Sequence, residues 1–366
     1  MPATSVSYKC PNCSAPLSFQ PGHDKVSCEY CGAELDIAAV DQLFQAKQEM
    51  AAREREAQEA KWDTADAGEH WDADELANLK AFTCSSCGAE IVCDENTMAT
   101  ECVYCGNPTM IPKRFSGMLK PDFVIPFKKT KADAVDALKK FYAGKTLLPS
   151  EFTANNRVEA IQPMYVPFWL FDANIDAHAT FQAKKIRVAD GGNQIIKTIS
   201  VFNVERAADM TFERVPVDGS KKMNDDFMDS IEPFNYKELV PFSAAYLAGY
   251  LADKYDVTAE QAVPRADLRI ENSVREVLFS TVKGYDSVEP QNTAVIKTEG
   301  SVSYALVPVW ILTTRYNNQP YTFMMNGQTG KVVGSLPYDS KKAFLYPAAV
   351  ALVVAIVAFI LISLIM

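Results

Sequence analysis

The chain has 366 residues, of which 48% are hydrophobic and 22% are charged, and its formal net charge is −10. This length is enough for two or three folding units, and the composition is that of an ordinary globular protein. Acidity on this scale argues against broad binding to a nucleic-acid backbone, because such binding needs clustered lysine and arginine.

The N-terminal segment opens a pattern of paired cysteines. It lacks the charged stretch followed by an apolar stretch that makes a signal peptide, so the cysteines are expected to stay in a reducing compartment and to bind metal. Cys10 and Cys13 are followed, after fourteen residues, by Cys28 and Cys31. Four thiolates fill the shell of a structural Zn²⁺ ion. Residues 1–40 are therefore predicted to be a first zinc ribbon.

Residues 41–80 are predicted to be a helical and acidic linker. The stretch 41–61 is rich in Ala, Gln, Glu, Lys and Arg, which favours an exposed helix or a semi-rigid spacer. Trp62 and Trp71 then flank an acidic run. Two alternatives stay open for these tryptophans: they pack back onto a neighbouring module, or they anchor a partner protein.

The same cysteine spacing returns in residues 81–112, which are predicted to be a second zinc ribbon with its own Zn²⁺. Its ligands are Cys84, Cys87, Cys102 and Cys105. Four redox-active pairs are the alternative, but they leave the repeated spacing unexplained. Each ribbon carries more carboxylates than basic side chains, which favours protein partners over phosphate. The ninth cysteine, Cys93, is predicted to be a small buried residue.

Residues 113–340 are predicted to form a cytoplasmic, mixed α+β domain. Thr130 and Asp133 resemble a capping box that starts a helix, and Gly144 suits its end. Further helices are predicted at 243–255 and 265–282, and strands at 196–205, 293–299 and 301–313 with "EGS" as a turn between the last two. The sequence "NGQTG" at 326–330 predicts a hairpin.

The motif Val-Pro-x-Trp occurs twice in this domain, within 165–172 and within 306–313, and each copy is followed by a polar turn and Thr-Phe. This repeated motif predicts two related β-units in one sheet system, and chance similarity of the two segments is the alternative. Trp169 and Trp310 are expected in the core. A ligand groove between the two units is the alternative role.

No catalytic residue is predicted, and the chain is expected not to be an enzyme. The sequence "AGKT" at 143–146 lacks a glycine that a phosphate loop needs, and "DANIDAHAT" at 172–180 departs from a calcium loop. Zinc-protease and nucleophile-elbow motifs are absent from the sequence. An active site assembled from distant residues remains a third hypothesis, and it requires a polar pocket between the two β-units.

Residues 343–366 are predicted to be a transmembrane helix that anchors the chain by its tail. The 23 residues from 344 to 366 contain no charged side chain, and about 20 apolar residues suffice to cross a bilayer. Lys341 and Lys342 come just before this segment, which places the N-terminal bulk in the cytoplasm. The expected location is the cell membrane, crossed once.

The expected architecture is a multidomain α+β chain with two ribbons, a helical spacer, an α+β middle domain and one span, and this combination resembles known proteins. The blocks 8–37 and 82–110 resemble zinc ribbons of the transcription factor IIB type. The segments "CPNC…CEYCG", "CSSCGAEIVCDENT…CVYCGNP", "PDFVIPFKKTKADAVDALKKFYAGKTLLP", "PFSAAYLAGYLADKYDV" and "NGQTGKVVGSLP" carry a wider resemblance. They resemble a bacterial family of zinc-ribbon membrane proteins encoded near flotillin-type (SPFH-domain) proteins and relatives of phage-shock protein A.

This resemblance implies a non-enzymatic membrane adaptor that docks cytoplasmic proteins during envelope stress, with flotillin-type or phage-shock protein A-like proteins as partners. It carries over the eight ligand cysteines, namely Cys10, Cys13, Cys28, Cys31, Cys84, Cys87, Cys102 and Cys105, and no catalytic residue; the partner-binding residues stay unknown. The alternative is a membrane-tethered nucleic-acid-binding protein of replication or transcription, which the acidic ribbons oppose.

Overall fold

The computed structural model describes residues 17–19, 25–40, 42, 60–99, 101–113, 115, 117–155, 158–190, 195–223, 225–317 and 319–365. These residues form two separate sheets with helices. A small antiparallel sheet of β1 (Ser18–Phe19), β2 (Lys25–Ser27) and β3 (Glu34–Asp36) lies in the predicted first ribbon. The other described strands form one mixed sheet of 11 strands. The predicted α+β class is confirmed.

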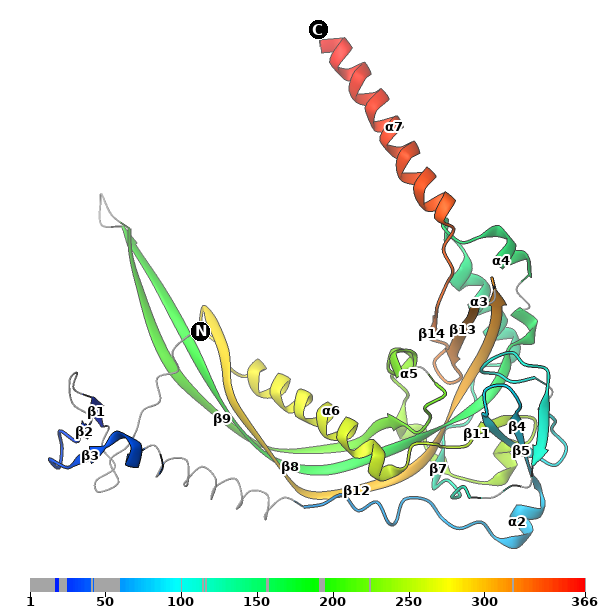
Figure 1. The fold of residues 1–366 in the computed structure, drawn as a ribbon, viewed down its shortest axis with the longest axis horizontal. Coiled ribbons are helices and arrows are strands. Elements are labelled where there is room, and N and C mark those ends of the chain that lie inside the picture. The colour runs from blue at the N-terminus through cyan, green and yellow to red at the C-terminus, as the bar shows by residue number, and fades with distance from the viewer. Residues whose placement is uncertain are drawn as a thin grey trace.

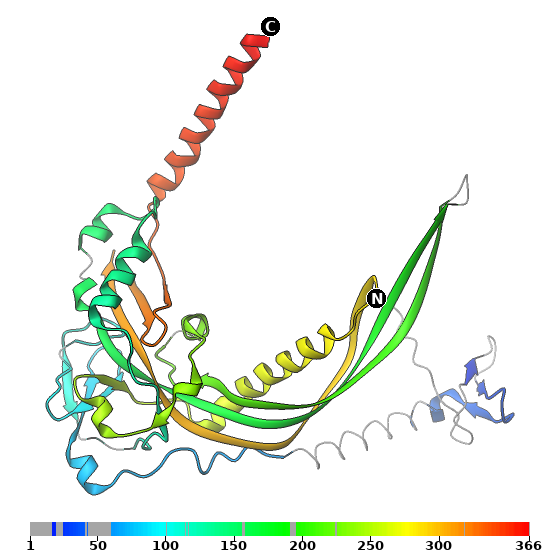
Figure 2. The same cartoon turned by 180° about the vertical axis from the view of Figure 1, so that it is seen from behind.

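Three very long strands form the backbone of the large sheet. Strand β8 (Gln162–Asp190) pairs antiparallel with β9 (Ile195–Asp218) and, on its other side, with β12 (Ser287–Tyr316). Together they curve into an arc, and α6 (Ala259–Ser280) lies along the concave face (Figures 1 and 2). Alternate residues of β8 from Ala173 to Ala183 pack in one apolar cluster with α6, which is the period-two pattern of a strand with one buried face.

Shorter elements complete the fold. The sheet runs in the order β10-β7-β12-β8-β11-β5-β4-β6, with β13 beside β12 and β14 beside β13. Its remaining strands are β4 (Leu79–Cys84), β5 (Glu90–Asp94), β6 (Met110–Lys113), β7 (Phe123–Val124), β10 (Val240–Pro241), β11 (Leu251–Asp253), β13 (Gln319–Asn326) and β14 (Val332–Gly334). The other helices are α2 (Ala73–Ala77), α3 (Lys131–Tyr142), α4 (Ser150–Asn155), α5 (Asp225–Ile231) and α7 (Ser340–Ile365), with 3₁₀ turns at Val158–Ala160, Tyr236–Glu238 and Ala244–Leu247.

The centre of the sheet consists of two similarly built units. The first β-unit is β7, α3, β8 and β9, and the second β-unit is β11, α6, β12 and β13. The first strand of each unit joins the other unit, because β7 runs parallel to β12 and β11 runs parallel to β8. Val166 lies opposite Val307 in the antiparallel β8–β12 pair, so the two Val-Pro-x-Trp motifs lie side by side around this point.

Matching hydrogen bonds repeat in the two units. Each motif proline accepts a 2.8 Å bond from a glycine N–H, Gly219 to Pro167 and Gly327 to Pro308. Each motif tryptophan is buried in the core, as predicted. Trp169 Nε1 donates over 2.8 Å to the carbonyl of Val257, the residue before the N-cap of α6 in the second unit. Trp310 Nε1 donates over 3.0 Å to the carbonyl of Lys129, the residue before the N-cap of α3 in the first unit.

Both unit helices begin with the same capping box. Thr130 caps α3 with Asp133 as its partner, and Thr258 caps α6 with Gln261. The first box was predicted and is confirmed, as is the end of α3, where Gly144 has a φ of +73°. The second box explains why α6 starts at Ala259, six residues earlier than the predicted 265.

Two sequence predictions in this domain are wrong. Residues 243–255 do not form a helix, because Gly249 adopts a φ of +80° and Leu251–Asp253 form β11 between β5 and β8. The expected "EGS" turn is absent as well, because β12 runs through it with an irregularity between Lys297 and Glu299. Gly300 there makes room for the ring of Trp62, which a Cβ would meet at 2.8 Å.

The two tryptophans of the linker pack onto the large sheet. The Trp62 ring meets Phe171 edge-on at 4.9 Å, and its Nε1 donates to Asp267 of α6 over 2.8 Å. Trp71 contacts Phe115, with ring centroids 5.5 Å apart. Of the two alternatives, packing back onto a neighbouring module is therefore the one observed. The predicted spacer helix at 41–61 lies almost wholly outside the described residues.

Candidate metal centre

Two tight turns of identical design present the cysteines of the second ribbon. At the end of β4, the N–H of Cys84 donates to Ala89 over 2.9 Å, and Gly88 donates back to the Cys84 carbonyl over 3.0 Å. The turn from Cys102 to Gly106 repeats this pattern, with its glycine bond at 2.8 Å. Both glycines have positive φ, +70° and +65°, which favours glycine at the position after each second cysteine.

The four sulfurs of Cys84, Cys87, Cys102 and Cys105 lie within 4.8 Å of one another. Sγ of Cys84 is 3.6 Å from that of Cys105, and Sγ of Cys87 is 3.6 Å from that of Cys102. These separations are too long for disulfides. They are close to the edge of about 3.8 Å that a tetrahedron with metal–sulfur bonds of about 2.3 Å requires.

Within the described part of the chain, this is the one cluster of at least three potential ligand side chains with metal-binding geometry. Cys84 and Cys102 are buried, and Cys87 and Cys105 are half-buried. The donor set fits a closed structural site, since four sulfurs leave no coordination position open for water or substrate. A four-cysteine group that can bind a metal ion is thus confirmed here.

Local hydrogen bonds prepare one of the four thiols to lose its proton. Burial opposes ionisation of Cys84, but the N–H groups of Cys87 and Ser86 point at its sulfur from 3.5 Å and 3.4 Å and lower its pKa to about 7. Burial raises the pKa of Cys87 and of Cys102. A metal ion that binds here must displace the protons of these thiols, so its affinity depends on pH.

Two basic side chains reach the same turns from the large sheet and its connections. Arg315 of β12 donates through Nε to the Cys105 carbonyl over 3.2 Å, and Lys222 donates through Nζ to the Cys87 carbonyl over 3.0 Å. A divalent ion with four thiolates carries a net charge of −2, so these two cations offset it. Sequence reasoning missed both residues, which lie 210 and 135 positions away from their acceptors.

The second ribbon is built into the large sheet. Strand β4 pairs with β5 and β6, and β5 pairs with β11, which joins β8. Val103 and Tyr104, between the last two cysteines, pack in the cluster under the sheet centre, and Thr313 of β12 donates to the Val103 carbonyl over 2.5 Å. Residues 81–112, predicted as a separate module, thus share one sheet with the middle domain.

A buried polar group lies next to this junction. Asp253 of β11 and Ser220 are each 1% exposed, and the side chains of Ser220 and Tyr104 lie against the Asp253 carboxyl. Burial raises the pKa of Asp253 to about 7. Burial also raises the pKa of Tyr104, with the negative charge of Asp253 adding to the effect. No motif in the sequence pointed to this carboxyl.

Of the predicted first ribbon, Cys10 and Cys13 lie outside the described residues, so the structure does not test whether the four cysteines meet. The described turn repeats the design of the second ribbon: Cys28 donates to Ala33 and Gly32 donates to the Cys28 carbonyl, both over 2.9 Å, and Gly32 has a φ of +70°. Cys28 is buried and Cys31 is exposed.

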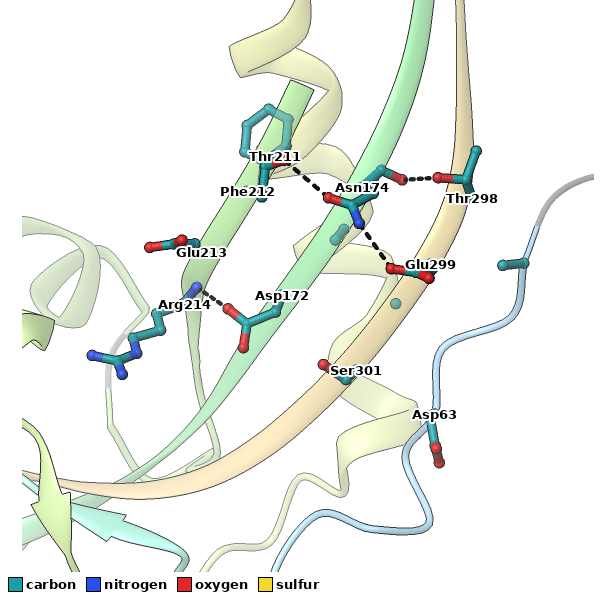
Figure 3. A pocket seen from close by; sticks show the side chains of 13 residues that line it. Asp63, Asp172, Asn174, Thr211, Phe212, Glu213, Arg214, Thr298, Glu299 and Ser301 are labelled. Atoms are coloured by element: carbon teal, nitrogen blue, oxygen red, sulfur yellow. Dashed lines mark hydrogen bonds between the residues drawn. The ribbon is translucent and has the colours of Figure 1, made fainter. Parts of the chain in front are cut away.

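A wide groove of about 720 Å³ lies over the middle of the long strands (Figure 3). Its polar side chains satisfy one another across strands: Thr211 donates to Asn174 over 2.9 Å, and Asn174 donates to Glu299 over 2.8 Å. Asp172 accepts the N–H of Arg214 over 2.5 Å. The described lining residues of the groove include neither cysteine nor histidine.

Helix α7 leaves the body at the end that carries α3 and α4 (Figure 1). Its stretch Ser340–Leu361 has a mean hydropathy of 2.7, is 0% buried and is long and apolar enough to cross a membrane. Its start is tied to the body, because Asp339 N–H donates to Leu147 and Lys342 Nζ donates to Leu148, both over 2.8 Å. The predicted apolar C-terminal helix is confirmed.

Comparison with known proteins gives one informative match. An uncharacterized protein of Bacillus subtilis, YdjG, is 34% identical to this chain over 346 residues, which make up 94% of each chain. No family model and no solved structure matches.

Proposed function

The chain belongs to the same family as YdjG of Bacillus subtilis, and on that premise we propose that it is a zinc-binding adaptor anchored in the membrane by α7. It performs no catalysis. Its ribbons dock cytoplasmic proteins at the inner face of the cell membrane, and the process it serves is the response to envelope stress. Flotillin-type (SPFH) and phage-shock protein A-like proteins are the partners that its sequence resemblance implies.

The observation that carries this proposal is the continuous hydrogen-bonded connection between the metal centre and the start of α7. The second ribbon shares its sheet with β8 and β12, and α7 is tied to the same body through Leu147 and Leu148. A partner bound by a ribbon in this arrangement is held at the bilayer. The closed four-sulfur geometry supports a structural metal rather than a catalytic one.

We propose Zn²⁺ as the metal in both ribbons. Tetrahedral sulfur sites select zinc or iron, and a structural role needs no redox change. For the first ribbon, the support is its repeated cysteine spacing together with the shared turn geometry at Cys28 and Gly32. Metal analysis of the purified chain tests this assignment: two zinc ions per chain are expected, and iron or a single ion contradicts it.

Affinity capture from gently solubilised native membranes, with mass spectrometry of the bound proteins, tests the adaptor role. The variant Cys10→Ser/Cys13→Ser should release at least one of the captured proteins, because it removes half of the first metal shell. Cys93→Ala is the matched control, since it removes a cysteine outside both sets. Capture of nucleic acid in a salt-sensitive manner contradicts the proposal. A set of captured proteins that is the same for the parent chain and for the Cys10→Ser/Cys13→Ser variant contradicts it as well.

A further inference from the structure

The hairpin of β8 and β9 continues well past its neighbours. We call residues 184–190 and 195–202 the hairpin tip. Strand β12 accompanies β8 only as far as the pair Ser287–Lys184, whereas the β8–β9 pairing continues to Asp190 and Ile195. The tip therefore projects as a two-stranded arm beyond α6 and β12 (Figures 1 and 2).

The face of the hairpin that points away from α6 changes character at the tip. Along β8 this face first carries only polar side chains, namely Asp172, Asn174, Asp176, His178, Thr180 and Gln182. Within the tip, five of the seven side chains described on this face are apolar and exposed, with Ile186 36%, Val188 66%, Ile195 78%, Ile199 51% and Val201 57% exposed, and the other two are Lys184 and Lys197. Five exposed branched apolar residues on one face mark an interaction surface.

Basic side chains lie on both faces of the tip: Lys184 and Lys197 share the face of the five apolar residues, and Lys185 and Arg187 lie on the opposite face. The tip carries Lys184, Lys185, Arg187 and Lys197 against the single carboxylate of Asp190, in a chain of net charge −10. Lys184 forms an ion pair with Glu289 over 2.9 Å, and Lys185 lies over the Tyr285 ring. Arg187 and Lys197 are exposed. The hairpin tip is thus a positive and apolar spot on an acidic protein.

We propose that the hairpin tip is a second membrane contact, which inserts its apolar face between the headgroups of an anionic bilayer. Apolar side chains with flanking Lys and Arg are the pattern of segments that lie in the membrane interface, and the inner leaflet attracts such basic segments. The inference rests on the proposed anchoring by α7. The tip and α7 rise from opposite ends of the curved sheet toward the same side (Figures 1 and 2).

Charge favours a lipid surface over a second copy of the chain. Two tips packed face to face bring together two surfaces that each carry an excess of positive charge, and like charges across an interface oppose association. Anionic lipid neutralises the same charges. A contact at each end of the sheet also fixes the sheet's orientation relative to the membrane, which one helix by itself does not do.

The test uses the full chain reconstituted in vesicles of phosphatidylcholine with phosphatidylglycerol. The photo-cross-linker p-benzoylphenylalanine replaces Val188 in the tip or, as a matched control, His178 on the polar part of the same face. Mass spectrometry identifies the adduct. We expect lipid adducts at 188 and at most background at 178, and a several-fold lower lipid yield at 188 in the variant Lys185→Glu/Arg187→Glu/Lys197→Glu or in vesicles of phosphatidylcholine alone.

Flotation of the vesicles separates this inference from the proposed anchoring. Protein that fails to float contradicts anchoring by α7. Protein that floats, but labels lipid equally at 188 and 178 or not at all, overturns the second contact. Adducts at 188 to another copy of the chain overturn it as well, because they assign the apolar face to self-association.

Discussion

At the scale of single residues, the backbone around each cysteine decides whether it serves as a ligand. Cys84 accepts two N–H groups and has its pKa lowered to about 7. Cys93, on the neighbouring strand β5, donates its thiol to the Thr97 carbonyl over 3.2 Å, and burial raises its pKa to about 11. The prediction that Cys93 is a small buried residue is confirmed, since it is 0% exposed.

This contrast predicts different outcomes for two cysteine substitutions. Cys84→Ser should remove one metal ion per chain and lower the free energy of unfolding by at least several kcal/mol, because metal binding contributes directly to folding. Cys93→Ala should keep the metal and lose about 1–2 kcal/mol through the lost packing. Metal analysis and thermal unfolding of both variants check this, and equal metal content in the two would contradict the ligand assignment.

Acidification should release the metal from the second ribbon. Protons compete for all four sulfurs, and the raised pKa values of Cys87 and Cys102 strengthen that competition. The affinity should therefore fall by about tenfold per pH unit for each proton displaced. Metal retention after dialysis against buffers of decreasing pH measures the effect; retention independent of pH below 7 would show that the thiols are not the ligands.

Asp253 makes a second prediction about pH. Its folded-state pKa of about 7 lies above the ordinary value for aspartate, so the unfolded state ionises first; stability is lost as the pH rises from about 4 to about 7 and stays level above that. The variant Asp253→Asn removes the titration. Its gain in unfolding free energy over the parent should grow by a few kcal/mol between about pH 4 and about pH 7 and then stay constant. A constant difference over that pH range would refute the raised pKa.

At the scale of elements, α6 is held by ion pairs as well as by its apolar face. Arg265 Nη1 lies 2.7 Å from Asp218, which is 2% exposed, and Arg269 binds Asp229 over 2.5 Å and Glu232 over 3.1 Å. These bonds hold the α5 segment and the end of β9 against α6. In the second β-unit, the position that corresponds to Asp218 is the neutral Asn326.

Removing the arginine from this half-buried pair of Arg265 and Asp218 should destabilise the fold. Arg265→Ala leaves the buried Asp218 carboxyl without its cation, and because burial already raises its pKa it should take up a proton; the expected loss of unfolding free energy is about 2–3 kcal/mol, less than for a fully buried pair. The double variant Asp218→Asn/Arg265→Ala should lose clearly less unfolding free energy. It replaces the buried carboxyl with asparagine, the neutral side chain that the second unit carries at the corresponding position, Asn326. Chemical denaturation of the two variants measures the difference, and a double variant as unstable as the single one would refute the explanation.

Element prediction from the sequence succeeded where the signal was local. The capping box at Thr130 and the hairpin at 326–330 are short-range patterns, and both are confirmed. The helix predicted at 243–255 was wrong because the chain makes only a 3₁₀ turn at Ala244–Leu247, and Leu251–Asp253 then form a strand between β5 and β8. In the same way, Gly300 is present for the close approach of Trp62, a contact between residues 238 positions apart in the sequence.

At the scale of the whole molecule, the curved sheet connects the metal centre, the hairpin tip and α7. The repeated pairing of the two β-units extends β8 and β12 across the body, and the second ribbon and α7 are both joined to the end that carries β13 and β14 (Figure 1). The protein is therefore built as a single frame with the metal centre near the proposed anchor and an arm at the far end.

Membrane attachment should depend on the apolar character of α7. Val353→Lys/Ile356→Lys places two charges at the middle of the segment, and each should cost about 2.5–3.5 kcal/mol of insertion free energy. The variant should move from the membrane fraction to the soluble fraction or to aggregates, whereas Val353→Leu/Ile356→Leu should stay in the membrane. Fractionation followed by immunoblotting measures this, and a doubly charged variant that stays membrane-bound argues against the span.

The sequence by itself determined the features whose signals are local: the cysteine spacing of the ribbons, the α+β class, the first capping box and the apolar tail. The four-sulfur cluster of the second ribbon follows from such spacing, because the turn around each pair is fixed by a few neighbouring residues. The alternation of side chains along the long strands was also present in the sequence, but it did not reveal how far those strands extend.

Only the tertiary structure decided how these parts meet. Lys222 and Arg315 reach the metal turns, β11 joins the ribbon to the sheet, and the apolar face of the hairpin tip is formed by pairing β8 with β9. Each of these contacts depends on strand register between distant segments. Register is set by packing of the whole sheet, and no single stretch of sequence specifies it.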